Sequence, residues 1–250
     1  MMQRVFALTK MLLKKVIREP AYLFLMILFP VALTLTFGLA FGAIGTSDTS
    51  SPTMFDFMAP GLFAYACIFI IMLVAQSFTD DREQGLLKRI NVTPTTSGQF
   101  MGSHLISNMI IAIIQVAVVF IMSLFMGYRP LGGIIGVLMA FVFMILLSLC
   151  SVGLGLITAS ISKSSGAATG ISFIFILPQM FFGTFIPLTP TTEIIAAFLP
   201  SYYVTSSLSS ILNEGSTINS EILINLGILA IMSVIIIIIG MFLFKKYSKN

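Results

Sequence analysis

Six long apolar segments constrain this chain more than any other feature of its sequence. A helix needs about 20 mainly apolar residues to cross roughly 30 Å of hydrocarbon. The segments that meet this length are 21–43, 57–79, 103–126, 133–159, 168–188 and 221–244. The chain is 58% hydrophobic and only 9% charged, and a water-soluble fold could not bury that much apolar surface. We therefore predict an all-α membrane protein with six transmembrane helices, in which residues 1–250 form one domain.

The basic residues predict the direction of these helices. Loops on the cytoplasmic side of a membrane are enriched in Lys and Arg. If the N-terminus is cytoplasmic, 12 of the 13 Lys and Arg residues lie on that side and only Arg129 lies outside. The opposite orientation reverses this distribution. We expect a multi-pass protein of the cell membrane with both termini in the cytoplasm.

Residues 1–19 predict an amphipathic helix that lies at the membrane interface. The cations on its polar face are Arg4, Lys10, Lys14, Lys15 and Arg18. Pro20 ends this helix and turns the chain into the first span. Two interpretations stay open. The helix either anchors the chain on the inner leaflet, with its cations facing lipid headgroups, or offers a docking surface to a cytoplasmic partner.

The loop of residues 80–98 is the most polar cytoplasmic segment. It begins with Asp80 and Asp81, continues with a mixture of charges, and is broken by Pro94. Leu86, Leu87 and Ile90 give it a small apolar face beside those charges. A solvated hairpin loop explains the charges alone. Charges combined with an apolar face favour contact with a soluble partner.

The longest outer connection is 189–220. Its apolar run 194–199 is too short to cross a membrane and is followed by Pro200, Tyr202 and Tyr203. This pattern predicts a pair of short re-entrant or interfacial helices, with the tyrosines near the level of the lipid headgroups.

Several kinds of chemistry are missing from the sequence. The six predicted spans hold essentially no Asp, Glu, Lys or Arg, which argues against transport driven by a proton gradient but leaves sodium coupling open. Cys67 and Cys150 lie apart in apolar runs, and with His104 they make no zinc site. No nucleotide-binding Gly-x-x-x-x-Gly-Lys-Ser/Thr loop occurs. We interpret His104 as structural and expect no catalytic residue, metal, cofactor or nucleic acid; the spacing gives no support to a Ser–His protease.

Small residues spaced four apart occur at Gly38 and Gly42, at Gly155 and Ala159, and at Gly166 and Gly170. Such spacing allows helices to approach closely. Packing within the chain is our preferred interpretation, and packing between subunits is the alternative.

Two motifs in this plan resemble those of a known family. The run Asp81-Arg82-Glu83-Gln84-Gly85-Leu86-Leu87-Lys88-Arg89 is similar to a Glu-Arg-Glu-x-Gly-Thr-Leu-x-x-Leu segment, with Leu86 where Thr is common. The runs Phe182-Gly183-Thr184-Phe185-Ile186-Pro187 and Leu199-Pro200-Ser201-Tyr202-Tyr203 are similar to Ser-Gly-x-x-x-Pro and Asn-Pro-x-x-Tyr elements. With the basic helix before the first span, these features resemble the ABC-2 type permease, the membrane subunit of ATP-driven exporters, and most closely its drug-exporter branch.

The resemblance implies a division of labour between chains. Two permease copies, identical or different, would form a dimer with the translocation path between them, and separate cytoplasmic ATP-binding cassette ATPase subunits would hydrolyse ATP, so this chain is not itself an enzyme. The residues implied in coupling to the ATPase are Asp81, Arg82, Glu83, Gly85, Leu86, Lys88 and Arg89. Residues 1–19, with Lys10, Lys14, Lys15 and Arg18, would form the connecting helix beside them.

The substrate is the least constrained expectation. An apolar path with few polar groups suits a hydrophobic or amphipathic cargo. From their placement we expect the path to be lined by Phe37, Phe41, Met180, Phe181 and Phe185. Contact of these side chains with lipid or with the protein core is the alternative. A stand-alone channel or ion-coupled carrier is the alternative function.

Overall fold

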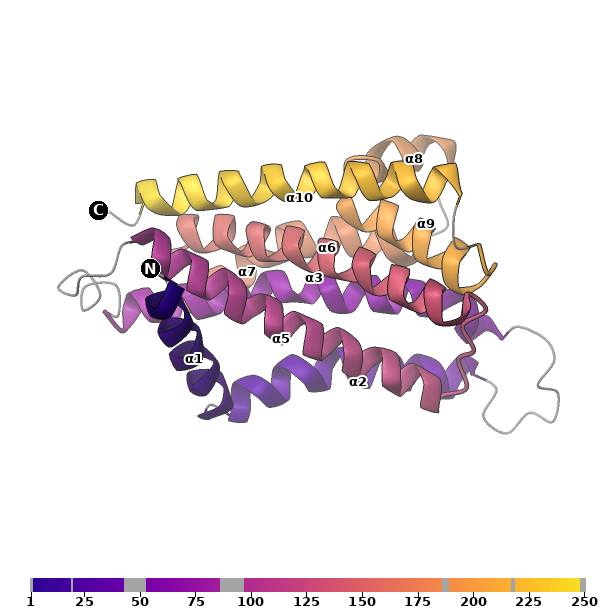
Figure 1. Cartoon of the computed structure of the whole chain (residues 1–250), viewed down its shortest axis with the longest axis horizontal. Coiled ribbons are helices and arrows are strands. Elements are labelled where there is room, and N and C mark those ends of the chain that lie inside the picture. The colour runs from indigo at the N-terminus through magenta and orange to yellow at the C-terminus, as the bar shows by residue number, and fades with distance from the viewer. Residues whose placement is uncertain are drawn as a thin grey trace.

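Helices make up most of the computed structural model, which describes residues 2–18, 20–42, 53–85, 97–185, 189–216 and 219–247. These ranges contain no strand. The long helices that lie alongside one another in Figure 1 are α2 (Pro20–Phe41), α3 (Met54–Glu83), α5 (Ser97–Phe125), α6 (Gly133–Ile161) and α10 (Ser220–Tyr247). α7 (Ser165–Met180) continues into a π-helical turn, η1 (Phe181–Phe185). Among the described residues the predicted all-α architecture is confirmed.

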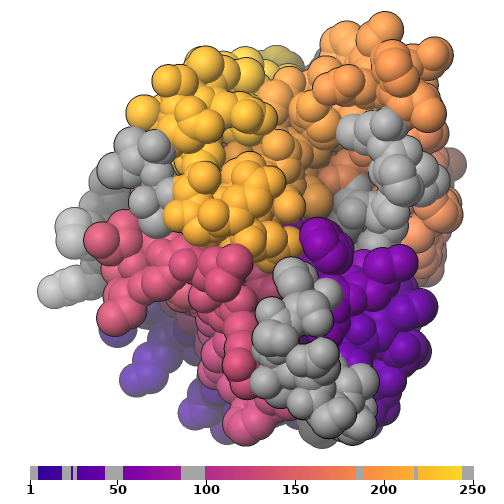
Figure 2. All heavy atoms as spheres, turned by 90° about the vertical axis from the view of Figure 1, so that its right-hand side faces the viewer, coloured from indigo at the N-terminus to yellow at the C-terminus, as the bar shows by residue number. Residues whose placement is uncertain are grey.

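The two ends of the bundle carry different elements. α1 (Met2–Arg18) lies at one end, together with the last turns of α3 and α10 and the junction of α6 and α7 (Figure 1). We name this the basic end, since it carries Lys10, Lys14, Arg18, Arg82 and Lys163. At the opposite end lie α8 (Pro190–Ala196) and α9 (Pro200–Leu212). Figure 2 views the molecule from this opposite end, where the orange and yellow atoms of the C-terminal third cover the upper half of the face.

α3 is the central helix of the bundle. Its residues from Ala59 to Ala75 are all buried, and α2, α5, α6, α7 and α9 pack around it. A helix that is apolar on every side is stable only when other helices or lipid enclose it. Thr53 and Asp56 cap its start by exchanging side-chain and backbone hydrogen bonds, as a capping box does.

Glycines allow α6 to lie close to two of its neighbours, α3 and α10. A Cβ on Gly155 would lie 2.6 Å from the Cβ of Val74 and 2.9 Å from the carbonyl oxygen of Ile71, both on α3. On the other side of α6, a Cβ on Gly240 of α10 would lie 2.8 Å from the carbonyl oxygen of Gly153. Gly155 therefore packs within the chain, as preferred above. By contrast, a Cβ placed on Gly166 or Gly170 would meet no atom of another helix within 4 Å.

Five helical stretches in the described residues are long and apolar enough to cross a membrane. They are Met54–Glu83, Gln99–Phe125, Gly133–Ile161, Ser165–Gly183 and Ser220–Leu243. The first predicted span falls on α2, whose described apolar stretch is Ile27–Phe41. α8 and α9 form a pair bent by 112°, which is either a re-entrant loop or a broken span, and the count reaches six only when the pair is taken as one span. The predicted all-α membrane fold is confirmed.

Candidate functional site

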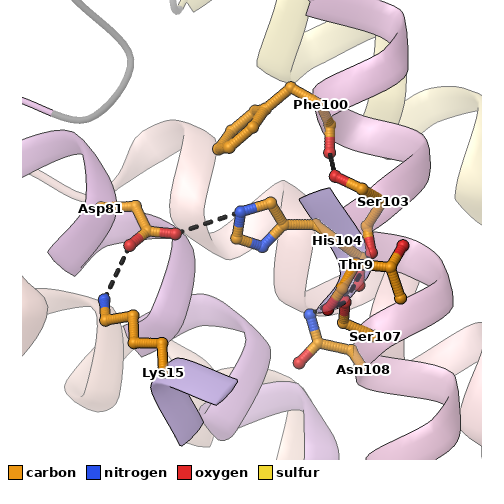
Figure 3. Close-up of polar contacts among 8 residues, drawn as sticks. All are labelled: Thr9, Lys15, Asp81, Phe100, Ser103, His104, Ser107 and Asn108. Atoms are coloured by element: carbon orange, nitrogen blue, oxygen red, sulfur yellow. Dashed lines mark hydrogen bonds and ion pairs between the residues drawn. The ribbon is translucent and has the colours of Figure 1, made fainter. Parts of the chain in front are cut away.

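The last turn of α3 is the most polar part of the bundle interior at the basic end. Asp81 is 1% exposed although it lies only two residues before the helix ends. One carboxylate oxygen, Oδ1, accepts a hydrogen bond of 2.7 Å from Nζ of Lys15 on α1. The other, Oδ2, lies 3.1 Å from Nε2 of His104 on α5. Figure 3 shows the carboxylate between these two side chains, so a single acidic group contacts α1 and α5 from α3.

His104 is held from both sides by aromatic rings. Its ring centroid lies 4.0 Å from that of Phe78 on α3 and 4.4 Å from that of Phe100 on α5. The side chain is 1% exposed. Packing of this kind leaves an imidazole little freedom to leave its rotamer. His104 is thus a fixed partner of Asp81, and the interpretation of His104 as structural omits this contact.

Arg82, the next residue, reaches in a different direction. Its Nη1 donates a hydrogen bond of 3.3 Å to the carbonyl of Ala159, and its Nη2 donates to the carbonyl of Ser162. These carbonyls lie at the C-terminal end of α6, where the helix leaves its last acceptors without internal donors. A cation there is also favoured by the helix dipole. Asp81 and Arg82 together tie the end of α3 to α1, α5 and α6.

α1 presents most of its cations outward and one inward. Lys10, Lys14 and Arg18 are exposed. The Lys15 side chain is 28% exposed and is bound to Asp81. In the interpretation that α1 anchors the chain on lipid headgroups, Lys15 differs from the other cations, because it is bound to a buried carboxylate. Arg4 lies outside the residues whose side chains the structure describes.

The remaining predicted coupling residues are only partly described. Glu83 is exposed at the end of α3, and Gly85 follows with φ +70°, a left-handed conformation suited to glycine. Leu86, Lys88 and Arg89 lie outside the described residues. Asp81 is buried, so its carboxylate does not belong to the surface at this end. Of the described residues in this segment, Glu83 is exposed at the surface and Arg82 binds the C-terminal end of α6.

The two glycine- and proline-containing motifs near the opposite end contact each other. A Cβ placed on Gly183 of η1 would clash with Oγ of Ser201 and come within 3.1 Å of the backbone nitrogen of Tyr202 on α9. The Ser201 hydroxyl donates a hydrogen bond of 3.2 Å to the carbonyl of Gln179. That carbonyl lies where α7 passes into the π-helical turn, and π-helical turns are frequent at functional sites. The backbone of the π-helical turn at Gly183 therefore lies close to the start of α9 at Ser201 and Tyr202.

The predicted path residues fall into two separate groups. Phe37 and Phe41 of α2 lie with their ring centroids 5.9 Å apart, and Phe41 is 45% exposed. Met180 is half-buried at the end of α7, and Phe181 is 43% exposed. α2 packs on α3 and α5, whereas η1 packs on α3, α7, α8 and α9. The single chain does not bring the two groups together, and the Phe185 side chain lies outside the described residues.

Asn213 links three segments at the opposite end. Its Oδ1 accepts a hydrogen bond of 2.9 Å from the hydroxyl of Tyr128, and its Nδ2 donates one of 2.9 Å to the carbonyl of Asp56. We expect Asn213→Ala to lower the free energy of unfolding in detergent by about 1–2 kcal/mol, and Tyr128→Phe, which removes one bond, by less. Thermal unfolding of the two purified variants beside wild type measures both. Equal midpoints for all three proteins would contradict the assignment.

The polar residues of α5 are a sequence signal for the buried cluster around Asp81 and His104. Polar residues recur on α5 at intervals of three, four or seven positions, and all are buried: Gln99, Ser103, His104, Ser107, Asn108 and Gln115. A polar stripe at helical spacing within an apolar span marks the side that faces protein, because lipid cannot satisfy those groups. Within the described residues, no group of three or more His, Cys, Asp or Glu side chains could hold a metal ion.

The comparison with known proteins covers the Asp81 cluster at the basic end and the contact between Gly183 and Ser201 at the opposite end. A family model described as ABC-2 type transporter matches residues 3–213, which extend from α1 through α9. The daunorubicin resistance ABC transporter permease protein DrrB1 of Streptomyces coeruleorubidus is 22% identical over 162 residues. These residues are 65% of this chain and 56% of that protein, so the match spans little more than half of the relative's length.

Proposed function

The chain belongs to the ABC-2 type transporter family, and from this membership we propose that it is the membrane-spanning permease subunit of an ATP-driven exporter. Residues 1–250 form one transmembrane domain in this proposal, and its basic end faces the cytoplasm. The distribution of Lys and Arg supports that orientation, because 12 of the 13 residues then lie on the cytoplasmic side.

The observation that carries the proposal is the arrangement of the basic end. The exposed cations of α1 and the exposed Glu83 belong to two elements that the Lys15–Asp81 contact joins. These residues contain no nucleotide-binding Gly-x-x-x-x-Gly-Lys-Ser/Thr loop, and in this proposal a separate ATP-binding cassette subunit supplies the hydrolysis. α1 and the segment that begins at Arg82 are the surfaces on which that subunit would dock.

The position of the predicted path residues supports a path between two copies of the chain or between this chain and a homologous one. Phe41 and Phe181 lie on outer faces of the bundle, where they meet lipid unless a second subunit covers them. A path enclosed by two such faces is mainly apolar and fits an amphipathic or hydrophobic cargo. The relative is named for resistance to daunorubicin, an amphipathic anthracycline, and we take an anthracycline as the first substrate to test.

Transport in inside-out vesicles tests the function. Vesicles that hold the chain and its ATP-binding cassette subunit should accumulate a fluorescent anthracycline when ATP is added, and should not do so with a non-hydrolysable ATP analogue. Vesicles with the ATPase subunit alone are the control. Flux through the purified chain alone, without ATP, would instead establish the alternative of a channel or ion-coupled carrier.

A further inference from the structure

Asp81 is a buried carboxylate in the last turn of α3. Moving a charged group out of water costs several kcal/mol unless partners replace the water. Oδ1 of Asp81 has such a partner in Nζ of Lys15 at 2.7 Å, whereas Oδ2 lies 3.1 Å from Nε2 of His104 without making a hydrogen bond. These two side chains come from different helices, so the cost of burying the charge is offset only while α1, α3 and α5 keep their present arrangement.

The two partners of Asp81 are held with different strength. His104 is enclosed by Phe78 and Phe100 and is 1% exposed. Lys15 is 28% exposed and projects from a helix that packs mainly on α5 and to a lesser degree on α2. The contact with His104 therefore fixes the carboxylate, and the contact with Lys15 fixes α1 to it.

A small cavity lies between α1, α3 and α5 beside this contact. Its volume is about 20 Å³, enough for a single water molecule. The lining residues are Leu12, Lys15, Val16, Ser77, Asp80, His104, Ser107, Asn108 and Ile111. Side chains do not fill the space between α1 and α3 at this point, so the ion pair between Lys15 and Asp81 is the polar contact that bridges the two helices there.

We propose that Asp81 is a positioning residue, whose buried carboxylate holds α1 against α3 and α5 so that α1 and the last turn of α3 move as one body. The consequence for transport rests on the proposed function: an ATPase that pushes on either element then displaces both. Asp81 itself touches neither the ATPase nor the cargo. It acts through Lys15 on one side and His104 on the other.

The position of α1 can be tested without any partner. A cysteine in place of Leu12, which is 4% exposed on the face of α1 turned inward, reports whether α1 stays packed. The native Cys67 and Cys150 are buried and provide a low background. In nanodiscs, Asp81→Asn and Lys15→Met should each raise the rate of labelling by an impermeant maleimide about fivefold, which corresponds to about 1 kcal/mol. The pair of changes combined should do no more than either one, because both remove a single contact.

Two matched variants control this measurement. Lys163→Met removes an exposed cation from the same end and should leave the labelling rate unchanged. Lys15→Arg keeps the cation and should restore slow labelling. If Asp81→Asn impairs folding, Lys15→Met breaks the same contact from its more exposed side. Unchanged labelling in Lys15→Met overturns the inference.

Coupling is measured in vesicles with the ATPase subunit present. We expect Asp81→Asn and Lys15→Met to lower the amount of cargo moved per ATP hydrolysed about fivefold, while the ATPase stays bound. A residue with only a structural role would lower protein yield, hydrolysis and transport together and leave this ratio unchanged, which would overturn the inference. If labelling responds as expected but wild type shows no ATP-dependent transport, the proposed function fails and the positioning of α1 by Asp81 stands.

Discussion

Gly155→Val should prevent the bundle from reaching its native packing. The first atom of the new side chain would lie 2.6 Å from the Cβ of Val74 and 2.9 Å from the carbonyl oxygen of Ile71. A backbone carbonyl in a helix cannot turn aside, so α6 and α3 must move apart. Because α3 is the buried centre of the fold, this movement also loosens the contacts that α3 makes with its other neighbours.

The expected size of this effect follows from overpacking. Inserted methylenes in a packed core typically cost 1–3 kcal/mol, and more where backbone must shift. We expect Gly155→Val to lower the thermal unfolding midpoint and the fraction of monodisperse protein in detergent. Gly227→Val is the matched control, because nothing lies within 4 Å of a Cβ at that position on α10. Equal losses in the two variants would show that helix propensity, and not the α3–α6 contact, causes them.

Gly183→Ala should abolish most transport while leaving much of the bundle folded. A Cβ at this position clashes with the hydroxyl of Ser201 and crowds the backbone nitrogen of Tyr202. The π-helical turn and α9 must then separate at the end of the bundle opposite α1. We expect ATP-dependent accumulation of cargo to fall about tenfold, equivalent to about 1.4 kcal/mol.

A second substitution tests the cause of that loss. Ser201→Gly removes both side-chain atoms that the new methyl group meets, and leaves Tyr202 as the remaining close neighbour at 3.1 Å. The double variant should therefore recover part of the transport that Gly183→Ala loses. No recovery, with the double variant folded and present in equal amount, would contradict the contact as the cause. The thermal unfolding midpoint checks folding independently of transport.

The four-residue spacing of small residues predicts close helix packing at some positions only. The interval between Gly155 and Ala159 predicts a close approach, and the structure puts this approach against α3. The same interval between Gly166 and Gly170 leads to open space. The same spacing leads to close packing at one position and not at the other. A small residue only permits a neighbouring helix to approach, and the packing of the whole bundle determines whether a helix lies there.

The burial of Asp81 cannot be predicted from local sequence, for a related reason. The sequence places Asp81 in the polar cytoplasmic loop 80–98, whereas the structure buries its side chain in the last turn of α3. Its burial depends on Lys15, which is 66 residues away in sequence, and on His104 on another helix. No property of the local sequence around Asp81 reports those two neighbours.

The sequence by itself determined that this chain lies in a membrane, that it is helical, and where its long helices run. These properties depend on the apolar length of each segment, which is local and adds along the chain. Only the tertiary structure decided that Asp81 faces inward between Lys15 and His104, that α1 is fixed to α3 by one ion pair, and that Gly183 meets Ser201. Such contacts depend on the directions of side chains on helices distant in sequence, and those directions are settled only when the whole bundle has packed.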